Sequence, residues 1–168
     1  IGKKSLDTQK IFYPLCQSSW GFEEKEAILN QVDSGHFTMG KMVGLFEKKF
    51  ANYFNSKYAV MVNSGSSANL VIVAALTLSP KYDLNKGDEV IVPSLGWSTS
   101  YAPFFQYGLK LRFVDINKFT FNIDEQKIEN AITSKTKAIL GINILGNPIE
   151  FSKIQKICKK HNLILIED

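Results

Sequence analysis

Short apolar runs alternate with longer amphipathic stretches along most of this chain. The apolar runs are rich in β-branched residues and span residues 58–62, 89–93, 109–116, 137–143 and 163–166. Runs of this length and composition are typical of buried strands. Stretches with helical spacing span residues 21–34, 42–54, 68–78, 125–133 and 150–161. Strands that alternate with helices predict an α/β fold with a mostly parallel sheet.

Turn and capping residues punctuate this pattern. Pro80 ends the helix that begins at Ala68, because proline cannot continue a helix. Asp124 is a typical N-cap for the helix that follows it. The stretch 97–107 is polar and aromatic and is assigned no element. The chain stops on an acidic residue, Asp168, directly after an apolar strand, which predicts a truncated domain.

Composition and charge argue against several classes of function. Hydrophobic residues make up 45% of the 168 residues and charged residues 21%, as in soluble globular proteins. The net charge of +4 comes from scattered lysines, and the densest set lies on one predicted helix, where a solvated face is expected: Lys153, Lys156, Lys159 and Lys160. A basic stripe interleaved with aromatics is missing, so nucleic-acid binding is not supported.

Membrane and redox signals are weak as well. The longest apolar run, Leu70 to Leu78, is too short to span a bilayer, and no secretory signal is visible, so we predict a cytoplasmic protein. Cys16 and Cys158 are far apart and form no C-x-x-C pair. Buried thiols are therefore expected in place of a disulfide framework, and no metal site is predicted.

A candidate phosphate site lies between the first predicted strand and the helix after it, in the segment Asn63-Ser64-Gly65-Ser66-Ser67-Ala68. The first amides of a helix have no internal partners and carry the positive end of its dipole, so they can hold a phosphate. Gly65 lets the backbone approach a ligand, and Ser66 and Ser67 add hydroxyl donors. An ordinary serine-capped turn is the alternative. The motifs G-x-x-x-x-G-K-[ST] and G-x-G-x-x-G are absent, so ATP and dinucleotide sites are not indicated.

Two further residues follow predicted strands, at the edge where ligands bind in open α/β sheets. Trp97 could stack on a flat heterocycle, although a packed core tryptophan is the alternative. Asp168 ends the last strand, where a carboxylate suits a cationic partner such as a protonated pyridine nitrogen. The alternative for Asp168 is an N-cap of a helix beyond this chain. Together the three features supply a phosphate cradle, a stacking ring and a partner for a ring nitrogen.

With these motifs in place, the chain resembles the DegT-like sugar aminotransferases and dehydratases, which are fold type I pyridoxal-phosphate enzymes. The similarity runs from about Tyr13 to the last residue, and it is carried by residues 57–70, 86–93, 113–116, 136–139 and 166–168. The resemblance implies the N-terminal part of a three-layer large domain with a mostly parallel sheet. It also implies pyridoxal or pyridoxamine 5'-phosphate as the cofactor, held by Gly65, Ser66, Ser67, Trp97 and Asp168.

Within that family, three loops resemble the nucleotide-sugar 3-dehydratases: residues 35–40, 65–69 and 145–148. Those enzymes remove the C3 hydroxyl of CDP- or GDP-linked 4-keto-6-deoxyhexoses during deoxysugar and lipopolysaccharide biosynthesis. The resemblance implies a segment 1–56 with helices and a substrate loop, followed by a partial cofactor domain, 57–168. The substrate loop would comprise Phe37, Thr38, Met39 and Gly40. His36 beside it could be read as catalytic, but a loop histidine without a special role is favoured.

The catalytic residue is not assigned, because the resemblance places it beyond Asp168. A histidine there would indicate a 3-dehydratase, whereas a lysine would indicate a nucleotide-sugar aminotransferase of the same family. A truncated, inactive cofactor-domain fragment is a further alternative. The resemblance also implies a homodimer in the full-length enzyme, with a nucleotide-linked 4-keto-6-deoxy sugar as the substrate.

Overall fold

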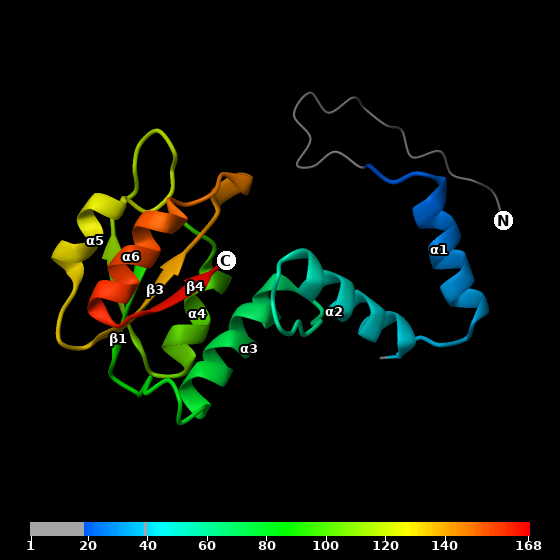
Figure 1. Cartoon of the computed structure of the whole chain (residues 1–168), viewed down its shortest axis with the longest axis horizontal. Coiled ribbons are helices and arrows are strands. Elements are labelled where there is room, and N and C mark those ends of the chain that lie inside the picture. Colours follow the sequence, from blue (N-terminus) through cyan, green and yellow to red (C-terminus); the bar gives the residue numbers. More distant parts are fainter. Residues whose placement is uncertain (1–18, 39) are drawn as a thin grey trace. The chain divides into compact units, whose positions relative to one another are not determined.

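The computed structural model describes residues 19–38 and 40–168, and the chain divides into two compact units, Ile1–Val60 and Met61–Asp168 (Figure 1). The domain limits expected from the sequence, 1–56 and 57–168, remain a prediction.

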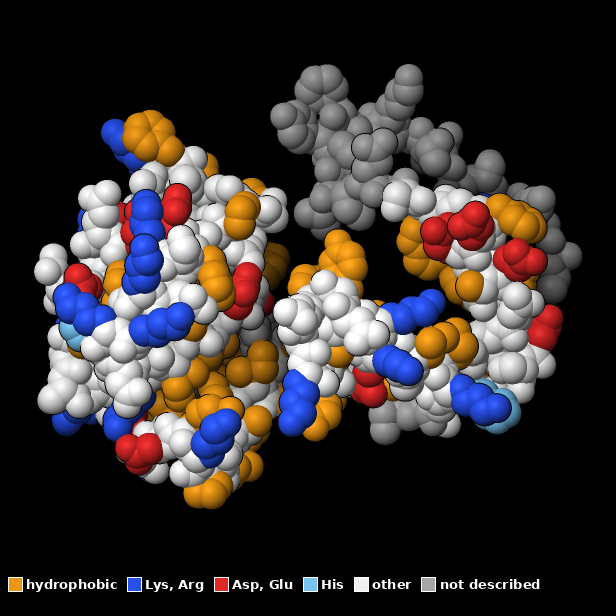
Figure 2. Space-filling view, viewed as in Figure 1, with side chains coloured by type: hydrophobic (Ala, Val, Ile, Leu, Met, Phe, Trp, Pro, Cys, Tyr) orange, Lys and Arg blue, Asp and Glu red, His pale blue; other side chains and the backbone are white. Residues whose placement is uncertain are grey.

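Two helices make up the described part of the first unit, α1 (Phe22–Asp33) and α2 (Lys41–Tyr53). Both were expected from their helical spacing. Their apolar side chains are largely exposed, and Figure 2 shows hydrophobic side chains in orange on the surface of this unit. The loop between them turns at Gly35, whose φ of +67° lies in the left-handed region that favours glycine. The side chain of Gln31 donates to the carbonyl of His36 and braces this loop.

The second unit is a parallel sheet of four strands with helices between them. The strands are β1 (Glu89–Pro93), β2 (Lys110–Val114), β3 (Thr136–Gly141) and β4 (Ile164–Glu167). The helices are α3 (Gly65–Leu78), α4 (Ser98–Gln106), α5 (Glu125–Ala131), the 3-10 turn η1 (Ile144–Gly146) and α6 (Phe151–His161). The order across the sheet is β2-β1-β3-β4, and every neighbouring pair is parallel.

Alternation along the strands separates two cores. Val90 and Val92 of β1 pack in the cluster that holds Val73 of α3 and Phe104 of α4, whereas Ile91 faces the cluster of α5 and α6. Successive side chains of a strand point to opposite faces, so one strand fills both cores. The result is three layers, with α3 and α4 on one face of the sheet and α5 and α6 on the other. This architecture confirms the predicted fold class.

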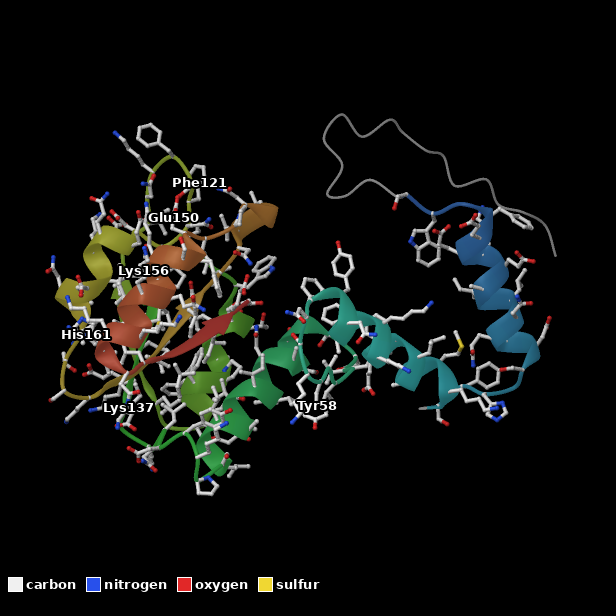
Figure 3. All side chains as sticks on the ribbon, viewed as in Figure 1. Tyr58, Phe121, Lys137, Glu150, Lys156 and His161 are labelled. Atoms are coloured by element: carbon white, nitrogen blue, oxygen red, sulfur yellow. The ribbon has the colours of Figure 1, made fainter. Side chains whose placement is uncertain are left out.

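The strand expected at residues 58–62 is wrong. These residues form no regular element, and the side chain of Tyr58, labelled in Figure 3, is 75% exposed. A strand needs a neighbour to hydrogen-bond with. Among the described residues, no strand pairs with this segment.

Helix α4 occupies the stretch that was assigned no element, and helix α3 begins earlier than expected. Pro103 lies inside α4, and it is buried together with Phe104. Burial of this apolar pair against the sheet therefore outweighs the poor helix propensity of proline. Helix α3 starts at Gly65 and not at Ala68, with Ser64 as its N-cap. The predicted phosphate turn is thus the first turn of a helix.

The lysine-rich helix α6 presents a solvated face, as expected. Lys156 is exposed, and His161 lies at the end of the helix (Figure 3). Two lysines of this face form ion pairs with α5: Lys153 with Glu125 and Lys160 with Glu129, both at 2.8 Å.

The sequence also predicted buried thiols and an apolar run too short to cross a membrane. Cys158 is buried on the inner side of α6, and burial raises the pKa of its thiol to about 11. Cys16 lies outside the described residues. Across the described residues, no helix is long and apolar enough to cross a membrane, and no group of acidic, histidine or cysteine side chains could hold a metal ion.

Candidate functional site

A pocket of about 460 Å³ lies at the carboxyl edge of the sheet, within the second unit. It is lined by Gly65, Ser66, Asn69, Trp97, Ser98, Thr99, Ser100 and Asp168. These residues come from the start of α3, the loop between β1 and α4, the start of α4, and the end of β4. Its volume is that of a site for a small organic ligand. The structure thus brings four of the five predicted binding residues to one place.

The first turn of α3 supplies a concentration of amide donors. The Ser64 hydroxyl caps the helix by accepting a hydrogen bond from the Ser67 amide at 3.2 Å. No acidic residue lies in this turn to neutralise the positive end of the helix dipole. A methyl group added to Gly65 would meet no atom of the protein within 4 Å. Within the described residues, therefore, no contact requires glycine at this position. A ligand that approaches the backbone closely would require it, because a side chain would occupy the same space.

Ser67 differs from its neighbours. Its side chain accepts a hydrogen bond from the Ser64 hydroxyl at 3.2 Å, and it does not line the main pocket. It borders a smaller hollow of about 210 Å³ between α3 and α4. Its predicted contact with a phosphate remains a prediction.

Trp97 is presented to solvent on a firmly held loop. Its side chain is 81% exposed, so the alternative of a packed core tryptophan is wrong. The Tyr101 hydroxyl donates to the carbonyl of Pro93 at 2.8 Å and anchors the loop. A Cβ at Gly96 would lie 2.4 Å from the Tyr101 hydroxyl, so only glycine allows the loop to pack this closely. Burial, and then the negative charge of Asp168, raise the pKa of Tyr101 and keep it a donor.

Asp168 continues the ladder between β3 and β4. Its amide donates to the Gly141 carbonyl at 2.8 Å, and its carbonyl accepts from the Asn143 amide at 2.9 Å. Its carboxylate atom Oδ2 accepts hydrogen bonds from Asn69 at 3.0 Å and from Ser100 at 2.5 Å. Across the described residues, Oδ1 has no hydrogen-bond partner, and no lysine, arginine or histidine forms an ion pair with the carboxylate. This oxygen is therefore available to a cationic N–H group.

Sequence reasoning missed Asn69 and Ser100. Asn69 is a polar residue at the start of the apolar part of α3, a signal that could have marked it. Ser100 lies in the stretch that was assigned no element, so no signal pointed to it. Both reach Asp168 only through the tertiary fold, because they lie 99 and 68 residues from it along the chain.

The predicted substrate loop belongs to the first unit. Phe37, Thr38 and Gly40 lie between α1 and α2, and Met39 lies outside the described residues. Thr38 and Gly40 border a hollow of about 780 Å³ in this unit, together with His36. The placement of this loop beside a substrate remains a prediction.

This three-layer α/β fold carries an amide-rich helix start, an exposed indole and a half-satisfied carboxylate at the carboxyl edge of its sheet, the edge where α/β proteins bind ligands. The chain belongs to the DegT/DnrJ/EryC1/StrS aminotransferase family, whose sequence profile matches residues 19–168. A GDP-4-keto-6-deoxy-D-mannose 3-dehydratase of Yersinia pseudotuberculosis is 53% identical over 158 residues, which cover 94% of this chain and 40% of that protein.

Two further relatives define the range of likeness. The solved structure of an Escherichia coli GDP-4-keto-6-deoxy-D-mannose 3-dehydratase with bound hydrated PLP superposes with a TM-score of 0.87 at 52% identity, over 93% of this chain and 40% of that one. A dTDP-3-amino-3,6-dideoxy-alpha-D-galactopyranose transaminase of Aneurinibacillus thermoaerophilus is 38% identical over 87% of this chain and 39% of its own length. The chain thus spans about 40% of the length of these relatives.

Proposed function

We propose that this chain binds pyridoxal or pyridoxamine 5'-phosphate in the pocket at the carboxyl edge of the sheet. The amides of Gly65 and Ser66 would hold the phosphate, and the Ser67 hydroxyl, which borders the neighbouring hollow, would add a donor. Trp97 would stack on the pyridine ring, and Asp168 would accept a hydrogen bond from the protonated ring nitrogen. The observation that carries the proposal is the convergence of these three kinds of group on one pocket.

The residues of the pocket suit this cofactor in charge and shape. A phosphate is an anion, and it complements the uncompensated positive end of α3. The open space beside Gly65 leaves room for close approach to the backbone. A flat heterocycle suits the exposed indole of Trp97. The free oxygen of Asp168 matches the single N–H⁺ of a pyridinium.

We further propose that the protein containing this chain is a nucleotide-sugar 3-dehydratase, which removes the C3 hydroxyl of a GDP- or CDP-linked 4-keto-6-deoxyhexose. The support is the 53% identity to the Yersinia dehydratase across 94% of this chain. When bound, the cofactor would supply the electron sink for this chemistry. The residues of this chain would bind and orient it and hold its ring nitrogen protonated.

A nucleotide-sugar aminotransferase is the second candidate, supported by the 38% identity to the transaminase of Aneurinibacillus. The residue that separates the two activities is expected beyond Asp168. Sequencing the gene past that codon tests the choice: a histidine at the expected position supports the dehydratase, and a lysine supports the aminotransferase. An immediate stop codon would contradict both activities for this chain and leave an inactive cofactor-binding fragment.

The homodimer and the cytoplasmic location are part of the same proposal. Large apolar side chains that are exposed within each unit, such as Phe105 of α4, are consistent with further contacts in the complete enzyme. Sedimentation of the full-length protein tests the dimer, and a monomer at micromolar concentration would contradict it.

The binding proposal is tested by titrating the protein with pyridoxamine 5'-phosphate. The amine form is the better probe, because the aldehyde of pyridoxal phosphate also reacts with surface lysines. A Trp20→Phe background leaves Trp97 as the reporting fluorophore. We expect saturable quenching of its fluorescence, and competition by inorganic phosphate. Absence of saturable binding by calorimetry would contradict the proposal.

Gly65→Ala provides a matched control for the phosphate cradle. The methyl group meets no protein atom, and alanine favours a helix over glycine, so the variant should be as stable as the wild type or more stable by up to about 1 kcal/mol. Its affinity for pyridoxamine phosphate should nevertheless fall, since the methyl group would hinder approach to the amides. An unchanged affinity would show that the phosphate does not lie there.

A further inference from the structure

The carboxylate of Asp168 is held in an asymmetric way. Both of its hydrogen-bond donors contact the same oxygen, Oδ2, and they come from two different helices. Asn69 reaches it from α3 at 3.0 Å, and Ser100 reaches it from α4 at 2.5 Å. The second oxygen, Oδ1, has no partner within the described residues.

Both donors are buried, and among the described residues neither side chain has a hydrogen-bond partner other than Asp168. Asn69 is 8% exposed and Ser100 is 4% exposed. A buried polar group that loses its partner is costly, so these hydrogen bonds hold the carboxylate in one orientation.

The donors are also neutral. A lysine or arginine at either position would compensate the negative charge of the carboxylate and compete with a cationic ligand. An amide and a hydroxyl fix the group and leave its charge unopposed. The charge of Asp168 is therefore directed to whatever occupies the pocket that this residue lines.

We infer that Asn69 and Ser100 are positioning residues, which orient Asp168 so that Oδ1 receives the N–H⁺ of a pyridinium ring. This inference rests on the proposed cofactor. It adds two residues that do not touch the ring nitrogen and act on it only through Asp168. Changing either side chain should therefore lower the affinity for ligands with a ring nitrogen and leave the affinity for other ligands unchanged.

The test compares two ligands, pyridoxamine 5'-phosphate and its 1-deaza analogue, in which a C–H replaces the ring nitrogen. We expect Asn69→Leu and Ser100→Ala each to weaken binding of pyridoxamine phosphate about tenfold, as for the loss of a hydrogen bond to a charged group. Binding of the 1-deaza analogue should not change. Ser100→Thr keeps the hydroxyl that Ser100→Ala lacks. This variant should therefore bind pyridoxamine phosphate in preference to the 1-deaza analogue, as the wild type does.

A double-mutant cycle with Asp168→Asn provides a second, independent readout. If Asn69 acts through Asp168, then Asn69→Leu should have no further effect on the affinity of the Asp168→Asn protein. An equal loss of affinity for both ligands would overturn the inference, because it would indicate a general distortion of the pocket. Full additivity in the cycle would overturn it as well.

The proposed cofactor and the positioning role fail in different ways. If the wild-type protein binds neither ligand, the cofactor proposal fails and the inference falls with it. If the wild type prefers pyridoxamine phosphate and the Asn69 and Ser100 variants keep that preference, the cofactor proposal stands and only the positioning role is refuted.

Discussion

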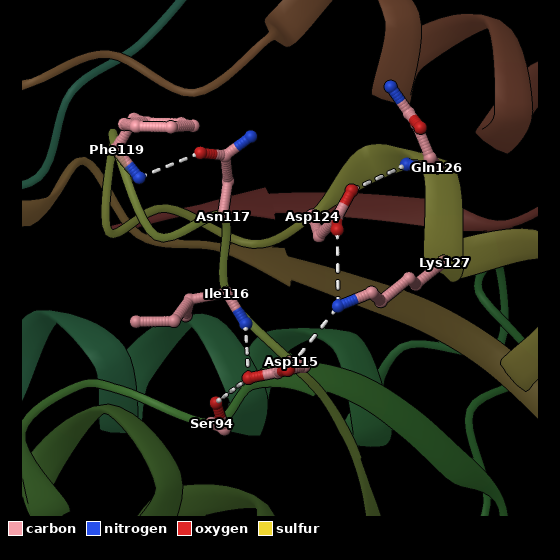
Figure 4. A network of polar contacts seen from close by, with 8 residues as sticks. All are labelled: Ser94, Asp115, Ile116, Asn117, Phe119, Asp124, Gln126 and Lys127. Carbon is pink, nitrogen blue, oxygen red and sulfur yellow. Dashed lines mark hydrogen bonds and ion pairs between the residues drawn. The ribbon is translucent and has the colours of Figure 1, made fainter.

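Two aspartates directly follow strands of the same sheet, and they are held in opposite ways. Asp115 follows β2, and both of its carboxylate oxygens are engaged (Figure 4). Oδ1 accepts from the Ile116 amide at 2.9 Å and lies 3.5 Å from the Ser94 hydroxyl, while Oδ2 pairs with Lys127 at 3.3 Å. Asp168 follows β4 and has two neutral donors on one oxygen, while its other oxygen has no hydrogen-bond partner among the described residues.

The difference separates a structural carboxylate from a binding one. The Ile116 amide and then Lys127 hold the pKa of Asp115 below its ordinary value, so neighbouring groups of the protein satisfy the charge of this exposed carboxylate. Lys127 also pairs with Asp124, the N-cap of α5, so the network ties β2 to the next helix. Position after a strand is therefore not enough to mark a functional acid. What marks it is a hydrogen-bonding capacity that the protein leaves unused.

The largest expected effect is the difference in ligand affinity between Asp168→Asn and Asp115→Asn. Asp168→Asn removes the charge that would face the ring nitrogen, and we expect the affinity for pyridoxamine phosphate to fall by about tenfold to a hundredfold. Asp115→Asn should leave that affinity unchanged, because Asp115 does not line the pocket. Calorimetric titration of both proteins measures the contrast. Equal losses in the two variants would remove the distinction between the two sites.

A smaller effect is expected from Gly96→Ala, which disturbs the loop that carries Trp97. The new Cβ would lie 2.4 Å from the Tyr101 hydroxyl and 2.6 Å from a methyl carbon of Ile142. We expect a loss of about 1–3 kcal/mol in the free energy of unfolding, typical of overpacking. Urea denaturation measures it, with Gly65→Ala as the control that introduces the same methyl group without a contact. Equal stability of the two variants would show that the loop is not held as described.

The smallest effect is expected from Lys127→Met, which removes the ion pair of Asp115. Because the pKa of Asp115 is lowered in the folded protein, its contribution to stability is present above the pKa of an unfolded aspartate, about 3.9. It is lost as the pH falls through the lowered value. The variant should therefore melt at a slightly lower temperature than the wild type at pH 7, and the two should converge near pH 2.

Ligand binding completes this last test. Affinity for pyridoxamine phosphate should be the same in Lys127→Met and the wild type at pH 7. A difference in melting temperature that persists unchanged in acid would show that Lys127 stabilises the fold by packing and not by its charge.

Much of the fold was readable from local pattern, and the exceptions share one cause. The strands of the sheet and the helices α5 and α6 follow from apolar runs and caps, because those signals are local. Residues 58–62 have the composition of a strand, but a strand exists only with a partner. Helix α4 contains Pro103 and lacks a clear period, and it forms because Phe104 is buried against the sheet. In both cases contacts between residues distant in sequence decided the outcome. Among the described residues, 58–62 lack a pairing strand, whereas α4 has a buried contact with the sheet.

The candidate site likewise combines features that the sequence indicated with features that only the tertiary structure decided. The order of residues along the chain was enough to indicate Trp97 and Asp168, since groups that follow parallel strands meet at one edge of the sheet. Gly65 was indicated by its place at the start of a helix, where backbone amides can hold a phosphate. The chemistry of these residue types, and the positions of Trp97 and Asp168 after strands, were determined by the sequence itself. Only the tertiary structure decided that Trp97 is exposed, that Asn69 and Ser100 both contact Oδ2, and that the second oxygen is left for a ligand. The physical reason is that burial and hydrogen-bond partners are properties of packed elements, and no local pattern records which oxygen a distant side chain will reach.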